Sequence, residues 1–150
     1  MKKLIEKIVV LILVIIEIFE SPLNIKDSKF EFDLLSEINN QRLFYGLNEL
    51  ELSFELCDVA QIRAEEISEK WSHERSNGTK FDVLIQGREW SIAGENLAKF
   101  KGDCTSNVVV AEWMNSDSHR KNILNPKFTQ CGIGGFVFND VCYVALVLSD

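Results

Sequence analysis

Residues 130–148 read QCGIGGFVFNDVCYVALVL, two runs rich in Val, Phe and Leu on either side of Asn139 and Asp140. This pattern predicts a β-hairpin with strands over 130–138 and 141–148. Odd and even positions are both apolar, so each strand has apolar side chains on both faces. A sheet of that kind has to be covered on both faces. The hairpin therefore predicts a sheet that lies between two layers of helices.

Segments upstream of the hairpin supply these layers. Helices are expected over 33–45, after Ser53 as N-cap, over 106–115, and from 116 to before Pro126. The stretch 72–88 reads as loop with a helical turn over 81–85, and a further strand over 92–100 would complete the sheet. The expected fold class is α+β: a three-layer α–β–α sandwich with a small, mainly antiparallel sheet between helices.

Length, composition and net charge limit the number of domains and the class of partner. The chain has 150 residues, of which 46% are hydrophobic, and this is enough for one domain with a real core. The formal net charge of −7 argues against a nucleic-acid partner, which requires a basic surface.

The amino terminus suggests export. Lys2 and Lys3 precede an unbroken apolar run over residues 8–16. This order matches a secretory signal peptide, but no small-residue cleavage site follows it, so an uncleaved anchor is the alternative. An amphipathic or buried amino-terminal helix is less favoured, because nine consecutive apolar residues leave it no polar face. We expect a signal peptide or membrane anchor over 1–21, with possible membrane attachment through residues 4–19. A linker over 22–29 and one domain over 30–150 follow, located outside the cell or on the outer face of the membrane.

Four cysteines are compatible with disulfides. In the predicted hairpin Val137 faces Cys142 and Cys131 faces Leu148, which puts Cys131 and Cys142 about 20 Å apart along the ladder. A disulfide between them is therefore not expected. A bridge from Cys57 or Cys104 to the sheet and free thiols both remain open.

Only two histidines are present, His73 and His119, and Glu95 lies between them in the sequence. Two imidazoles and a carboxylate could ligate zinc or another divalent metal, or carry out acid–base chemistry. Their spacing alone does not require that they meet, and by itself it favours structural histidines. The positive end of the helix that begins near His119 should favour its neutral form.

Six sequence blocks, in a fixed order, shift the interpretation from structural histidines toward a functional site. They are INNQR before Gly46, WSH at 71–73, AGENLA at 93–98, WMNS at 113–116, SHRKNILN at 118–125 and FTQCGIG at 128–134. In this order they resemble the CAP superfamily of cysteine-rich secretory, antigen 5 and pathogenesis-related proteins, in its short bacterial SCP-like form. The resemblance covers residues 30 to 150 and implies the same α–β–α sandwich.

The resemblance also implies a cleft in which His73, Glu95 and His119 meet. Eukaryotic relatives usually carry a second glutamate where this chain has Ser116, and the neighbouring Asp117 could replace it in part. Asn96 and Ser72 are candidates for supporting the cleft; hydrogen bonds at a strand end and a helix cap are the alternative reading. The cofactor expectation is zinc or another divalent metal, held by His73 and His119.

Other conspicuous residues receive structural interpretations. Trp71, Trp90 and Trp113 are expected to fill the core. The acidic cluster of Glu65, Glu66 and Glu69 is expected on a solvated helix face.

The favoured function is an extracellular CAP-domain protein that binds a protein partner, a lipid or a divalent metal without turnover. The alternative is a metal-dependent hydrolase that uses the same residues. The resemblance favours binding, because no one reaction characterises the family. In addition, no serine or cysteine stands in a nucleophile motif with a histidine. A purely structural polar cluster is the third possibility.

Overall fold

The structure is a computed structural model that describes residues 23–24, 28–87, 89–102 and 104–150. The expected signal peptide or anchor over 1–21 lies outside these residues. Within the expected linker, Leu23–Asn24 forms the short strand β1, which pairs antiparallel with the end of β4.

The predicted hairpin forms the centre of the sheet. Strands β4 (Gln130–Phe138) and β5 (Val141–Ser149) pair antiparallel in the expected register, with Val137 opposite Cys142. Asn139 and Asp140 have φ of 51° and 59°, the left-handed backbone that a tight two-residue hairpin turn requires. The expected third strand is β3 (Ala93–Lys101), which pairs antiparallel with β5. The sheet order is β1-β4-β5-β3, and the short β2 (Glu51–Leu52) runs parallel to β4.

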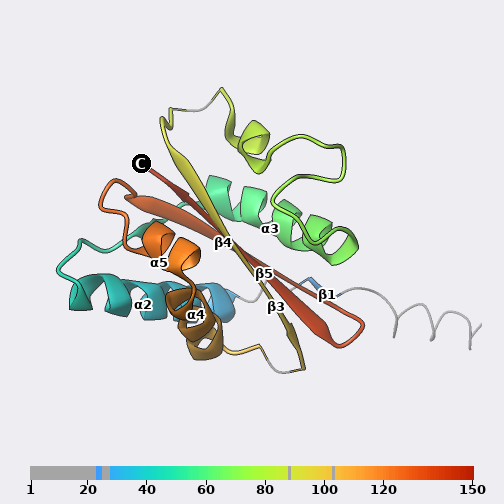
Figure 1. Cartoon of the computed structure of the whole chain (residues 1–150), viewed down its shortest axis with the longest axis horizontal. Coiled ribbons are helices and arrows are strands. Elements are labelled where there is room, and N and C mark those ends of the chain that lie inside the picture. The colour runs from blue at the N-terminus through green and yellow to red at the C-terminus, as the bar shows by residue number, and fades with distance from the viewer. Residues whose placement is uncertain (1–22, 25–27, 88, 103) are drawn as a thin grey trace, which may run out of the picture.

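Helices cover both faces, so the expected three-layer sandwich is confirmed (Figure 1). Helix α3 (Phe54–Glu69) packs on one face together with the short 3₁₀ helix η1 (Phe81–Ile85). Helices α2 (Ser28–Phe44), α4 (Ser106–Asn115) and α5 (Asp117–Ile123) pack on the other. Two separate buried clusters result, one on each face of the sheet.

The helix boundaries follow the local signals with one difference. The Ser53 side chain accepts a hydrogen bond from the backbone N–H of Leu56, as expected for the N-cap of α3. Helix α2 begins five residues earlier than the expected start at 33. Its apolar stripe extends one turn upstream, because Phe30 packs against the same buried cluster as Leu34.

Two polar residues of the INNQR block hold neighbouring segments against α2. The Asn39 side chain exchanges two hydrogen bonds with the backbone of Leu50, at 2.8 and 3.0 Å. The guanidinium of Arg42, 1% exposed, donates to the carbonyl oxygens of Asn48, Ile123, Asn125 and Phe128. Arg42 therefore fixes the end of α5 and the loop behind it to α2.

The structure resolves the cysteine pairing. Cys104 and Cys142 form a disulfide with a Cα–Cα distance of 6.1 Å, while Cys57 and Cys131 are free thiols. The expected absence of a Cys131–Cys142 bridge is confirmed. Burial raises the pKa of the Cys131 thiol to about 12, so this thiol is a core residue rather than a reactive group.

Reduction of the disulfide is expected to lower the free energy of unfolding by about 2–4 kcal/mol, because the bridge closes a long loop in the unfolded chain. The two cysteines are 38 residues apart in sequence. Urea unfolding with and without a thiol reductant measures the difference. A Cys104→Ser/Cys142→Ser variant should be equally destabilised and should no longer respond to reductant. Unchanged stability of the fully reduced chain would contradict the prediction.

Candidate functional site

Glu95 lies at the centre of the candidate site. It belongs to β3 and points to the α3 face, where its side chain is only 1% exposed. One carboxylate oxygen accepts from Nε of Arg63 at 2.7 Å, and the other is bonded to Nδ1 of His73 at 2.8 Å. Both oxygens of this buried carboxylate are thus engaged by two different elements.

Arg63 links the site to a longer chain of charges. Its side chain, fully buried on α3, also donates to Glu66 and, at 2.7 Å, to the carbonyl oxygen of Ser72. Glu66 in turn accepts two hydrogen bonds from Arg75, at 2.6 and 2.8 Å. Burial opposes the charge of Arg63, but the hydrogen bonds to the two glutamates outweigh it and raise its pKa. The loop that carries His73 is thereby tied to α3 on both sides of the histidine.

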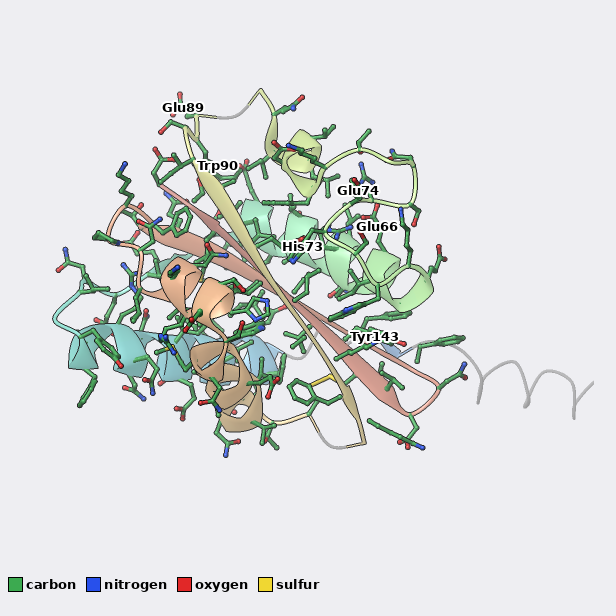
Figure 2. All side chains as sticks on the ribbon, viewed as in Figure 1. Glu66, His73, Glu74, Glu89, Trp90 and Tyr143 are labelled. Atoms are coloured by element: carbon green, nitrogen blue, oxygen red, sulfur yellow. A yellow bond between two sulfur atoms is a disulfide. The ribbon has the colours of Figure 1, made fainter. Side chains whose placement is uncertain are left out.

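This network corrects the expected role of the acidic cluster. The sequence places Glu66 on a solvated face, but in the structure its side chain is only 17% exposed. Burial alone would raise its pKa, yet hydrogen bonds from Arg75 and Arg63 lower it. Through Arg63, which also bonds to the backbone of Ser72, Glu66 is linked to the loop that carries His73 (Figure 2). Glu66 supports the site because Arg63 lies three residues before it on the same helix face.

The two histidines differ in environment. The side chain of His73 is 61% exposed, and its bond to Glu95 raises its pKa against the opposing effect of burial. The pKa of His119 is lowered by burial first and then by the positive charge of His73, and Glu112 opposes this only in part. This direction agrees with the expected preference of His119 for the neutral form, but the largest cause of the lowered pKa is burial and not the start of the helix.

Asparagine side chains hold α5 against β3. Asn96 donates to the carbonyl oxygen of His119 at 3.0 Å. Asn122 donates to Oδ1 of Asn96 at 2.9 Å and to the backbone oxygen of Glu95 at 3.2 Å. Asn96 therefore holds the backbone of His119 and does not contact its imidazole nitrogens. In the described part of the chain, Nδ1 of His119 is the one buried side-chain N or O atom without a hydrogen-bond partner.

The remaining expected residues have other partners. Asp117 is exposed and pairs with Arg120, while the hydroxyl of Ser116 lies 3.3 Å from that of Ser118. The hydroxyl of Ser72 accepts from the backbone N–H of Glu74, and its contribution to the site is its carbonyl oxygen. Within the described ranges, no group of three or more His, Cys, Asp and Glu side chains is arranged to hold a metal ion.

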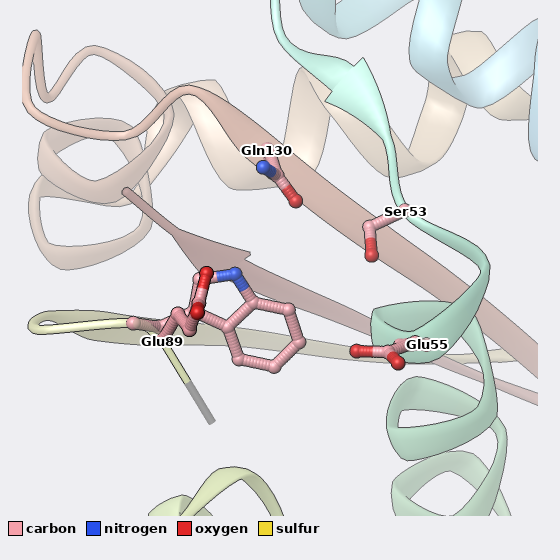
Figure 3. Close-up of a pocket in the computed structure, with 5 residues that line it drawn as sticks. Ser53, Glu55, Glu89 and Gln130 are labelled. Atoms are coloured by element: carbon pink, nitrogen blue, oxygen red, sulfur yellow. The ribbon is translucent and has the colours of Figure 1, made fainter.

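A separate hollow of about 410 Å³ lies where α3 begins (Figure 3). Its lining shares no residue with the histidine site and consists of Ser53, Glu55, Glu89, Trp90 and Gln130.

The three tryptophans, all expected in the core, differ in burial. Trp113 is fully buried, and its indole N–H donates to the carbonyl oxygen of Leu97. Trp90 is partly buried, whereas Trp71 is 47% exposed, so the core position expected for Trp71 is wrong.

Fold and site together define a three-layer α–β–α domain with a histidine–carboxylate pair beside a second histidine. The sequence model of the cysteine-rich secretory protein family, CAP, matches residues 35–147. The chain therefore belongs to the CAP family.

Individual relatives agree with this assignment. The chain is 37% identical over 111 residues to YkwD of Bacillus subtilis (strain 168), which covers 71% of this chain and 42% of YkwD. It is 33% identical over 108 residues to the membrane protein YlbC of the same organism, covering 69% of this chain and 31% of YlbC. The chain thus spans less than half of the length of these curated relatives.

Solved structures share the fold. An outer surface protein from Borrelia burgdorferi superposes with a TM-score of 0.73 at 24% identity, covering 85% of this chain and 97% of that protein. An extracellular protein containing a SCP domain from Bacillus anthracis str. Ames gives a TM-score of 0.64 at 25% identity. The match covers 79% of this chain and 40% of that protein. No helix within the described residues has both the length and the hydrophobicity of a membrane span.

Proposed function

We propose that this chain is a CAP domain exported across the cell membrane, which binds a ligand at His73, Glu95 and His119 without turning it over. The apolar amino-terminal run supports export, and so does a disulfide, a bond typical of oxidising compartments. The names of similar proteins point the same way, since they include an outer surface protein, an extracellular protein and a membrane protein.

The observation that carries this proposal is the fixed orientation of His73. The buried Arg63–Glu95 pair holds Nδ1 of an imidazole that is otherwise exposed, which leaves Nε2 for a ligand. A carboxylate that orients a histidine in this way is the usual support behind a metal-ligating histidine. His119 adds a second imidazole that favours its neutral, ligating form.

These residues fit a divalent metal, zinc in particular, as a two-imidazole site. The unpaired buried Nδ1 of His119 is a polar atom that a ligand in the site could satisfy. Both oxygens of Glu95 are already hydrogen-bonded to Arg63 and His73, so water or a bound partner would complete the coordination. When bound, a divalent ion supplies a Lewis acid. The chain itself orients His73 through Glu95 and holds His119 through Asn96.

The same geometry leaves neither carboxylate as a free general base. A general base needs a free proton-accepting atom near the water that it activates. Both oxygens of Glu95 already accept hydrogen bonds, and Asp117 pairs with Arg120. A protein or a lipid is the other class of ligand that this site could bind.

Zinc titration of the full chain in detergent tests the site. His73→Ala and His119→Ala should each lower zinc affinity at least about tenfold, since each removes one of two imidazoles. Asp117→Asn is the matched control: it changes a carboxylate two residues from His119 that pairs with Arg120, and affinity should stay unchanged. Equal affinity in the wild type and both histidine variants would rule out this metal site.

A further inference from the structure

An aromatic patch lies at the hairpin end of the sheet, on the face that α3 covers only in part. We define it by Trp71, Lys99, Phe136, Phe138 and Tyr143. Lys99, Tyr143 and Phe136 form one row across β3, β5 and β4. Phe138 stacks on Phe136 with ring centroids 6.4 Å apart, and Nζ of Lys99 lies 4.7 Å from the centre of the Trp71 ring.

Four of the five patch residues are at least partly open to solvent, whereas Phe136 is buried at 9% exposed. Trp71 is 47% and Phe138 39% exposed, and Tyr143 is half-buried at the hairpin end of β5 (Figure 2). Aromatic side chains with one polar end, flanked by lysine, are the residues that favour the interface between lipid and water. Lys99 contributes a positive charge at the aromatic surface, where its amine makes a cation–π contact with the Trp71 ring.

The amino-terminal segment enters the domain at this same end. Leu23 pairs with Val137 and Asn24 with Phe136, so β1 lies beside the patch strand, one residue from Phe138. Before it, the sequence has the apolar run 8–16 and then Ile18 and Phe19. Four residue steps separate Phe19 from Leu23, a reach of about 14 Å at most. A membrane-held apolar run would therefore keep the hairpin end within about that distance of the lipid headgroups.

We propose that the aromatic patch is a membrane-contact surface that rests on the lipid interface beside the amino-terminal anchor. This inference rests on the anchored form of the proposed function. The net charge of −7 opposes attraction to anionic lipid, so the contact is made by the aromatic side chains and does not require anionic headgroups. Trp71 stands two residues before His73. Contact with lipid would thus place the ligand site near the membrane surface.

Tryptophan quenching in vesicles tests the contact. The full chain is reconstituted in phosphatidylcholine vesicles whose lipids carry bromine on the upper acyl chain. Trp71 should supply the quenched emission, because Trp113 is fully buried and Trp90 is partly buried away from the patch. Trp71→Phe should remove at least half of the quenching. An equal quenched fraction in wild type and variant would overturn the proposal.

A matched pair of phenylalanine variants adds a second arm. Phe138→Ser should weaken the quenching of Trp71, whereas Phe54→Ser should not, although Phe54 is 79% exposed at the start of α3. Quenching that is weakened equally by both, or a patch occupied by a second copy of the chain in crosslinking, would overturn lipid contact. Zinc titration of the same vesicles is an independent readout, so loss of lipid contact with intact zinc binding overturns this inference and leaves the proposed site standing.

Discussion

Replacing Gly132 with alanine is expected to cost about 4 kcal/mol or more of unfolding free energy. A Cβ at this position would lie 2.0 Å from the backbone carbon of Leu56, and at Gly134 it would lie 2.3 Å from that of Ala60. Helix α3 crosses β4 so closely that its own backbone fills the space of these missing side chains. Since neither backbone can yield by rotating a side chain, α3 would have to move off the sheet.

Chemical denaturation of Gly132→Ala and Gly134→Ala measures the cost. Gly78→Ala is the matched control: its Cβ meets nothing within 4 Å, but its φ of +81° is left-handed. That control should lose only about 1–2 kcal/mol. Stability of Gly132→Ala at the level of the control would show that α3 does not depend on this close approach. Because Arg63 lies on α3, the variant should also lose the orientation of His73.

The close approach illustrates which parts of the fold the sequence predicts. The hairpin register follows from local features, because a two-residue turn and two-sided apolar strands leave few alternatives. The glycines alternate within the same strand, but their purpose depends on a helix some 70 residues away in the chain. Likewise, strand spacing excludes a Cys131–Cys142 bridge, whereas the choice of Cys104 depends on how the loop before α4 returns to β5.

The candidate site, like the fold, is predicted from the sequence only in part. Sequence blocks predict that His73, Glu95 and His119 are neighbours, and the structure joins the first two by a 2.8 Å bond. They do not reveal Arg63 or Arg75 as supporting residues. A signal for Arg63 does exist: it occupies the buried stripe of α3, four residues after Val59 and four before Ile67. A charge on an apolar stripe requires a buried partner, but the sequence does not say that the partner is Glu95.

The other large effect is expected at the Arg63–Glu95 pair. Arg63→Met leaves the Glu95 carboxylate, 1% exposed, without its cationic partner and should cost about 3–5 kcal/mol. Glu95→Leu should cost less, because Arg63 keeps its bonds to Glu66 and to the carbonyl of Ser72. The double variant should cost clearly less than the sum, with a coupling of roughly 2 kcal/mol or more, since it leaves no unpaired carboxylate. Urea unfolding of all four proteins gives this cycle.

The titration of His73 separates a positioning role from a purely structural one. In Glu95→Leu the hydrogen bond that raises the pKa of His73 is lost, while burial and the charge of Arg63 still lower it. The pKa of His73 should therefore fall relative to the wild type, as measured by NMR of its ring proton. The exposed pair Lys70–Glu74, 3.9 Å apart, is the control; Lys70→Ala should change stability by less than about 1 kcal/mol. Additive stability effects together with an unchanged pKa of His73 would mean that the Arg63–Glu95 pair neither acts as a unit nor orients this imidazole.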